Sequence, residues 1–277
     1  MKGECMSSGL LAVIASPVVL AADGGFKGPG IEEFFPDPML LQGTPFALNR
    51  VMLIRLISAL FILVCAWIYH SRAKLVPGRW QASFEMLLEF SKVQIGEELL
   101  EDKARKYQPL IAAIFLGTLF MNLTGIIPGL QLAGTSVVGM PLVYTIVTYL
   151  AFIIAGIKER GGLKFFREQL FPPGVPWPIY FIMTPIEFLS TFAIRPITLT
   201  VRLLANMVSG HMLLALCFLG THFLYFSMSG GTGIALGTVT LAGGILFTCF
   251  EAFIACLQAY IFAMLTASYI QLSISAH

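Results

Sequence analysis

The sequence predicts an all-α integral membrane protein with about five transmembrane helices and one amphipathic helix on the membrane surface. Of its 277 residues, 57% are hydrophobic and only 12% are charged. That charged share is about half the ~25% of soluble domains, and a soluble chain of this length could not bury so much apolar surface. The net charge of +2 is too small to predict a nucleic acid as a partner.

Residues 1–47 are predicted to form an extracytoplasmic N-terminal segment. Residues 10–22 are apolar, follow Lys2 and end in small side chains, which resembles a secretory signal peptide. This run is too short to cross a hydrocarbon core of ~30 Å as a helix. Glycines, prolines and acids then dominate up to residue 50, as is typical of an exposed irregular segment.

The membrane domain is predicted to cover residues 48–277. Its first span is 48–69, with Arg55 near the beginning, where the side chain can snorkel to the interface. In residues 80–107, apolar and charged side chains alternate at helical intervals, which predicts the surface helix. Two further spans are expected at 109–127 and 137–157, with a turn at Pro128-Gly129 between them.

Two long apolar blocks, 179–226 and 234–275, complete the chain. As single helices they would reach about 70 Å and about 60 Å, roughly twice the thickness of the bilayer core. Each block is therefore either a tight hairpin or one steeply tilted helix. Neither contains a polar turn, so two long tilted helices are favoured.

The distribution of basic residues predicts the orientation. The loops at 70–107 and 158–170 contain 11 of the 17 Lys and Arg residues, which places both in the cytoplasm. The loops at 129–136 and 227–233 carry no charge and are predicted to face outside. With five spans, the N-terminus lies outside and the C-terminus is cytoplasmic.

Several chemistries lack the residues that they need. The five cysteines show no metal-ligand spacing, and four lie in apolar stretches, where cysteine behaves as a small hydrophobe. There is no HExxH, G-x-S-x-G or P-loop motif, so proteolysis, acyl transfer and nucleotide binding are not supported. We expect no metal and no cofactor.

Arg202 is the most informative side chain, because it lies far from both ends of its apolar block. An ionisable group there costs about 2.5–3.5 kcal/mol on insertion scales, so it requires a partner or water. No carboxylate lies within one turn, and Asn206 shares the same helix face. Two interpretations follow: a structural ion pair with Glu251, or a permanent positive charge held for a mobile anion, either a substrate or a carboxylate on another subunit.

The remaining intramembrane polar groups lie close to Arg202 in sequence or on the last helix. Glu251 and Gln258 are two turns apart on one helix face, and Asn206 and His211 lie on neighbouring faces. They can line a water-filled proton path or form ordinary interhelical hydrogen bonds. His222 is predicted to be interfacial, and Arg195 to lie nearer the cytoplasmic surface.

The string TPIEFLSTFAIRPITLTVRLLANMVSGHMLL (184–214), followed by EAFIACLQAYIFAMLTASYI (251–270), resembles subunit a of F-type ATP synthases. This is the stator subunit beside the rotating ring of c subunits. The resemblance extends to MNLTGIIPG (121–129) and LVPGRWQ (75–81) and covers roughly residues 45–277. The spacing of Glu187 and Arg195-Pro196 is more similar to actinobacterial members than to mitochondrial ones.

The resemblance implies a role for each matching residue. Arg202 matches the essential arginine that faces the ring carboxylate, and Gln258 matches a glutamine near it. The other matches are Asn206 in the access path, His211 and Glu251 as a pair whose identities are exchanged in some bacteria, Glu187 and Ser190 in the cytoplasmic exit path, and Asn122 in the family's NL…P segment. Gly125 is a departure, because some members carry an aspartate there.

The function implied is proton translocation, not catalysis by this chain alone. The expected site is a bacterial plasma membrane, and the expected partners are the c-ring, peripheral-stalk subunit b, other ATP synthase subunits and membrane lipids. Two alternatives remain: a secondary transporter in which Arg202 binds an anionic solute, and a scaffold with an internal Arg202–Glu251 pair. No internal repeat supports a transporter.

Overall fold

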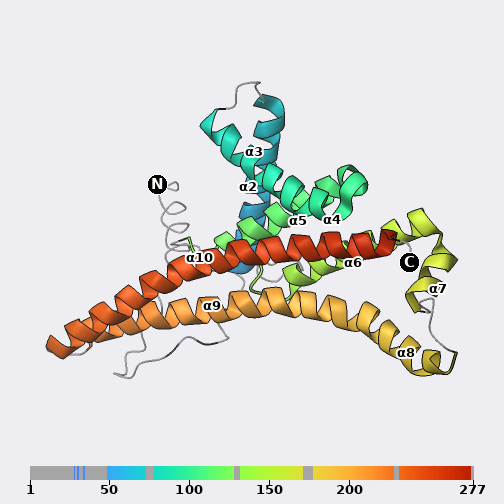
Figure 1. The fold of residues 1–277 in the computed structure, drawn as a ribbon. Coiled ribbons are helices and arrows are strands. Elements are labelled where there is room, and N and C mark those ends of the chain that lie inside the picture. The colour runs from blue at the N-terminus through green and yellow to red at the C-terminus, as the bar shows by residue number, and fades with distance from the viewer. Residues whose placement is uncertain are drawn as a thin grey trace, which may run out of the picture.

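The computed structural model is built from helices (Figure 1). It describes residues 28, 30, 34, 49–72, 78–127, 132–170, 177–227 and 231–275, and within these residues there is no strand. The signal-like stretch 10–22 lies outside the described residues, as does most of the predicted segment 1–47. Four described helices are long and apolar enough to cross a membrane. The predicted all-α membrane class is therefore confirmed.

Helix α2 (Arg50–Arg72) is the first of these four helices. Arg55 lies in the first turns of α2, and its side chain binds backbone carbonyl groups instead of only extending toward water. Its Nε donates a hydrogen bond to the carbonyl of Gly134 at 2.8 Å, and its Nη2 donates to the carbonyl of Val137 at 3.1 Å. The beginning of α2 is thus joined to the loop before α6.

The region predicted as one surface helix, 80–107, is not a continuous helix. It consists of α3 (Arg79–Ser91), the π-helical turn η2 (Lys92–Glu97), α4 (Glu98–Leu100) and the short 3₁₀ turn η3 (Glu101–Lys103). Glu101 has a φ of 46° and a ψ of −122°, a backbone conformation outside the right-handed helical region that interrupts the helix. The apolar side chains of this region pack against the protein core, among them Phe84, Leu87 and Leu88.

Helix α5 (Ala104–Leu123) is the centre of the core and corresponds to the predicted span 109–127. It is not among the four long apolar helices, because Arg105, Lys106 and Gln108 make its first turns polar. Farther along, its apolar side chains pack on fully buried alanines of α10. Small residues let helices approach closely in membranes. The buried alanines of α10 that pack against α5 are Ala259, Ala263 and Ala267.

The two long apolar blocks form long helices and not hairpins. Helix α8 (Trp177–Leu189) continues through the π-helical turn η4 (Ser190–Ile194) into α9 (Arg195–Phe226), and α10 (Gly231–Ile274) has 44 residues. Figure 1 shows α9 and α10 side by side, running across the direction of α2. The predicted pair of long final helices is confirmed.

Helix α6 (Gly139–Arg160) supports both long helices through buried hydroxyl groups. The Thr200 hydroxyl on α9 donates to that of Thr145 at 2.9 Å, and Thr148 is hydrogen-bonded to Thr266 on α10 at 3.1 Å. All four side chains are buried. We call these four residues the threonine seam.

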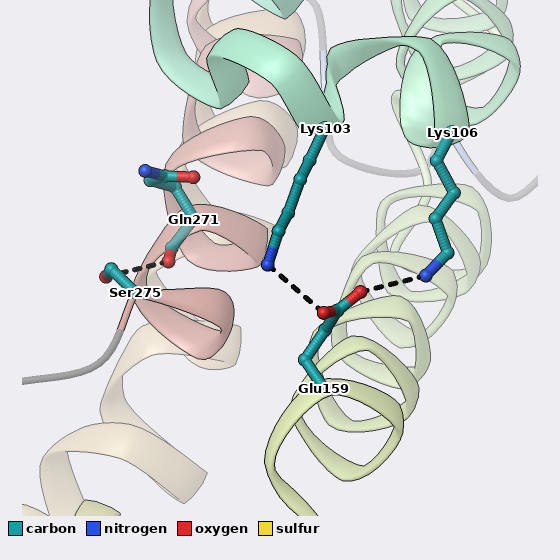
Figure 2. A network of polar contacts seen from close by, with 5 residues as sticks. All are labelled: Lys103, Lys106, Glu159, Gln271 and Ser275. Carbon is teal, nitrogen blue, oxygen red and sulfur yellow. Dashed lines mark hydrogen bonds and ion pairs between the residues drawn. The ribbon is translucent and has the colours of Figure 1, made fainter.

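An ion-pair cluster joins the end of α6 to the beginning of α5 (Figure 2). The carboxylate of Glu159 accepts hydrogen bonds from Lys103 Nζ at 3.1 Å and Lys106 Nζ at 3.0 Å. Figure 2 also shows Gln271 and Ser275, at the end of α10, nearby. The hydrogen bond to Glu159 raises the pKa of the Lys106 ammonium above its usual range. Short α7 (Gly162–Leu170) follows α6.

Candidate proton path between α9 and α10

Arg202 lies in the first half of α9 and faces away from the protein core. Its neighbours Leu199 and Leu203 are almost completely buried against Ile114 and Phe262, whereas Arg202 is exposed. No hydrogen bond or ion pair joins Arg202 to another residue that the structure describes. The structural pair with Glu251 considered above is not formed, so no described residue neutralises the guanidinium.

Asn206 and Gln258 join α9 to α10 one turn beyond Arg202. The amide Nδ2 of Asn206 donates to Oε1 of Gln258 at 3.0 Å. Gln258 is 3% exposed, and its Nε2 has no hydrogen-bond partner within the described part of the chain. A buried donor without a partner costs about 1–3 kcal/mol unless it meets water or another molecule. This amide is therefore ready to bind a further acceptor.

Glu251 is buried on α10, and its carboxylate packs directly against Gly210 of α9. A side chain at position 210 would occupy the place of the two carboxylate oxygens. A glycine inside a helix usually costs about 0.5–1 kcal/mol relative to alanine. At position 210, the close approach of the Glu251 carboxylate explains why a glycine is present.

A cavity of about 210 Å³ lies beside this contact. Its polar lining comes from Asn206, Ser209 and Glu251, and its apolar lining includes Leu213 and Phe250. The space is sufficient for several water molecules, and the polar groups supply the partners that such waters need. The Glu251 carboxyl group can therefore exchange protons with such waters, and the Asn206 amide can hold them by hydrogen bonds.

His211 belongs to a different face of α9. Its ring contacts Phe34 edge to face, with 5.1 Å between the centroids, and does not line the cavity. Phe34 is buried with Val51, Ile54 and Leu132. The structure thus separates His211 from the cavity side of Glu251, although sequence reasoning treated the two residues as a pair.

Glu187 lies on α8, beside the π-helical turn that Ser190 begins. Its Oε1 is 3.7 Å from Nη2 of Arg195 and accepts a hydrogen bond from the Thr191 hydroxyl at 3.3 Å. The Glu187 side chain is 29% exposed and that of Arg195 is 26% exposed. The result is a partly exposed acidic site, 15 residues before Arg202 in the chain.

Asn122 does not join this arrangement. It is 1% exposed at the end of α5, and its Oδ1 accepts a hydrogen bond from the Thr135 hydroxyl at 2.6 Å. It therefore fixes the α5–α6 loop. Gly125, in the turn that follows, lies next to Ala133. His222 is exposed near the end of α9 and packs on Phe226.

Metal chemistry has no support in the part of the chain that the structure describes, where no group of three or more His, Cys, Asp or Glu could hold an ion. Sequence reasoning missed three contributors to the site: Ser209, Gly210 and Thr191. For Gly210 a signal was present, since a glycine inside a helical stretch often has a packing reason.

These features define a class of protein: a helical membrane protein with a polar cavity for several water molecules between two long helices, and with an arginine side chain exposed on the protein surface. The chain belongs to the ATP synthase subunit a family. The family described as ATP synthase A chain matches residues 52–271. The resemblance stated from the sequence motifs is thereby confirmed.

Individual relatives agree with the family match. The chain is 41% identical to ATP synthase subunit a of Rhodococcus erythropolis over 94% of each chain. It is 36% identical to that of Frankia alni, covering 94% of this chain and 89% of the relative. It is 35% identical to that of Pseudarthrobacter chlorophenolicus, covering 94% and 97%. The predicted likeness to actinobacterial members is confirmed.

Proposed function

We propose that this chain forms two offset aqueous half-channels that meet a ring of c subunits at Arg202, and so couples proton flow to rotation. The family is that of the proton-channel stator subunit of the ATP synthase membrane sector. The observation that carries the detailed proposal is the exposure of Arg202 in the middle of a long apolar helix.

An exposed arginine at this depth is costly if it faces hydrocarbon, and it cannot be relieved by losing its proton. The described residues offer it no carboxylate. A carboxylate on a neighbouring subunit would satisfy the charge and would be held in its ionised form beside it. Arg202 would then also repel protons and prevent a direct leak between the two half-channels.

The access half-channel is proposed to pass Asn206, His211 and Glu251. The cavity that Glu251 and Asn206 line supports this path, because it places a titratable carboxyl group beside space for water. His211 lies about one turn beyond Asn206 on a neighbouring face. It lies within the stretch of α9 that lines the cavity, so it would act at the level of the cavity but from another face of the helix.

The exit half-channel is proposed to pass Glu187 and Ser190. Their partial exposure and their position before Arg202 on the same long helix support this path. A proton from the access path neutralises a ring carboxyl group, which can then face lipid as the ring turns. On reaching Arg202 from the other side, that carboxyl group releases its proton toward Glu187.

The proposed orientation places the N-terminus outside and the C-terminus in the cytoplasm of a bacterial plasma membrane. The end of α10 lies near Glu159 at the beginning of the basic segment 158–170, which the positive-inside rule assigns to the cytoplasm (Figure 2). The proposed partners are the c-ring, peripheral-stalk subunit b and membrane lipids. Nothing in the comparisons supports an anion transporter.

The test is ATP-driven acidification of inverted membrane vesicles that contain the assembled complex. Arg202→Ala is expected to abolish acidification while the c-ring still co-purifies with this chain. Arg79→Ala, an exposed arginine at the beginning of α3, is the matched control and should leave acidification unchanged. Normal acidification by an assembled Arg202→Ala complex would overturn the proposal, as would normal acidification by Arg202→Ala combined with Glu251→Ala.

A further inference from the structure

The long helix that carries Arg202 is interrupted by one π-helical turn, Ser190–Ile194. Such a turn adds one residue to the helical repeat and is frequent at functional sites. Glu187 and Arg195 are eight residues apart. In a regular α-helix, seven residues make about two turns and an eighth rotates the side chain by about 100°. The added residue therefore returns Arg195 to the side of the helix on which Glu187 lies.

The contacts agree with this change of register. Arg195 Nη2 is 3.7 Å from Glu187 Oε1, and the Thr191 hydroxyl, within the π turn, donates to the same oxygen at 3.3 Å. The carboxylate is thus held by a cation and a hydroxyl group. About a quarter of each charged side chain remains exposed, so the pair is accessible to water.

Arg195 is itself held in place by α10. Its guanidinium carbon lies 5.8 Å from the ring centroid of Tyr269, within cation–π range. Tyr269 packs against the buried cluster that contains Leu203 and Phe262. The contact limits the freedom of a long side chain and connects Glu187, through Arg195, to the helix that also carries Gln258 and Glu251.

Arg195 also shares a helix face with Arg202. The two are seven residues apart within the regular α9, which is about two turns or ~10 Å along the axis. With the π turn included, Glu187, Arg195 and Arg202 follow one another along the same side of the helix. A regular helix through 190–194 would turn Glu187 away from this line.

We infer that Arg195 is a positioning residue, which holds the Glu187 carboxylate on the Arg202 side of the helix and apart from Arg202 itself, through the register that the π turn creates. This inference rests on the proposed exit path. A surface ion pair with only a structural role would contribute little and would not require an irregular turn to form.

The test is a double-mutant cycle on ATP-driven acidification by the assembled complex in inverted vesicles. Arg195→Gln and Glu187→Gln are each expected to slow acidification by up to about tenfold, within the range that a misplaced group can cause. The double variant should be no slower than the slower single variant, because both changes remove the same arrangement. Arg195→Lys should restore part of the rate by returning the charge.

The matched control breaks an ion pair that has no place in the path. Lys92 and Glu97 in η2 are 3.4 Å apart and about half exposed, and Lys92→Gln should acidify at the wild-type rate. A wild-type rate for Arg195→Gln would overturn the inference. So would an equal additional loss from Arg195→Gln in the Glu187→Gln background, because Arg195 would then act independently of Glu187.

The inference and the proposed function can fail separately. If Glu187→Gln acidifies normally while Arg202→Ala does not, Glu187 is not on the path and the inference falls, but the stator role stands. If Arg202→Ala acidifies normally in an assembled complex, the proposed function falls.

Discussion

Two sets of polar groups lie on the helices of this bundle, and they differ in whether other described residues bind them. In the threonine seam, Thr145 and Thr148 of α6 are hydrogen-bonded to partners on α9 and α10. On α9 and α10, the exposed Arg202 has no hydrogen bond or ion pair with a described residue, and the buried Nε2 of Gln258 has no partner among these residues either. The first set holds helices together. The second set has no such partner among the described residues, as the proposed contact with water and a neighbouring subunit requires.

This difference marks candidates for functional polarity without reference to conservation, but it is not sufficient alone, because Asn122 Nδ2 and the Thr118 hydroxyl are also buried without a partner among the described residues. Polar groups that serve packing find each other within one chain, because an unmet buried group costs about 1–3 kcal/mol. Groups retained despite that cost point to a ligand, a solvent path or a partner. Four predictions test the distinction, from the largest expected effect to the smallest.

Gly210→Ala should have the largest effect after loss of Arg202. The added methyl group meets the far end of the Glu251 side chain, so the carboxylate has to move from its place against α9. We expect acidification in vesicles to fall by about tenfold, within the range that a misplaced group can cause. The control is Gly220→Ala on the same helix, where nothing lies within 4 Å of the new atom. Equal rates for the two variants would contradict the cavity assignment.

Gln258→Leu should slow acidification several-fold. It removes the acceptor of the Asn206 amide and places an apolar side chain beside the path. The unpaired amide costs about 1–3 kcal/mol. Gln271→Leu makes the same chemical change three to four turns farther along α10 and should have no effect on the rate. If both variants behave alike, the amide of Gln258 has no special role.

Thr148→Val should leave acidification unchanged and lower stability slightly. The variant keeps the shape of the side chain and removes the hydrogen bond to Thr266. Interhelical hydrogen bonds in membranes are worth about 0.6 kcal/mol on average. Thermal unfolding of the detergent-solubilised complex would measure the shift. Loss of acidification by a fully assembled Thr148→Val complex would break the distinction between the two polar sets.

Glu159→Gln should have the smallest effect, visible only as a minor fall in thermal stability at low ionic strength. The cluster with Lys103 and Lys106 is largely open to solvent, where salt screens the attraction. Because the pairing raises the pKa of Lys106, its contribution is constant around neutral pH. It is lost as alkaline pH rises through that raised pKa, and also as acid pH falls through the pKa of Glu159, which the hydrogen bonds from Lys106 and Lys103 lower below its usual range. A fall in stability as pH drops from 8 to 6 would contradict this assignment.

Sequence reasoning predicted the features that depend on composition and spacing. Hydrophobic length predicted the two long helices, and the isolation of Arg202 in an apolar block left two interpretations, an ion pair with Glu251 or an anionic partner outside the chain. The i to i+4 relation between Arg202 and Asn206 placed both on one face of α9. These inferences hold because helical periodicity fixes neighbours within a helix whatever the tertiary structure.

Features that depend on contacts between helices could not be predicted. The contact between the Glu251 carboxylate and Gly210 depends on how α9 and α10 are aligned along each other. The residue pattern of a single helix does not contain this information. The π turn at Ser190–Ile194 shifts every later residue by about 100°, so a regular 3.6-residue repeat misplaces Glu187. The hydrogen bonds of Arg55 likewise join residues 79 and 82 positions apart.

The close contact between Gly210 and Glu251 also has a genetic consequence. Two positions that compete for the same space should vary together, with bulk gained at one offset by bulk lost at the other. Glu251→Asp shortens the acid by one methylene group, about the volume that Gly210→Ala adds. Second-site revertants of a Gly210→Ala strain, selected for growth that depends on ATP synthesis, should therefore be enriched for a shorter acid at position 251.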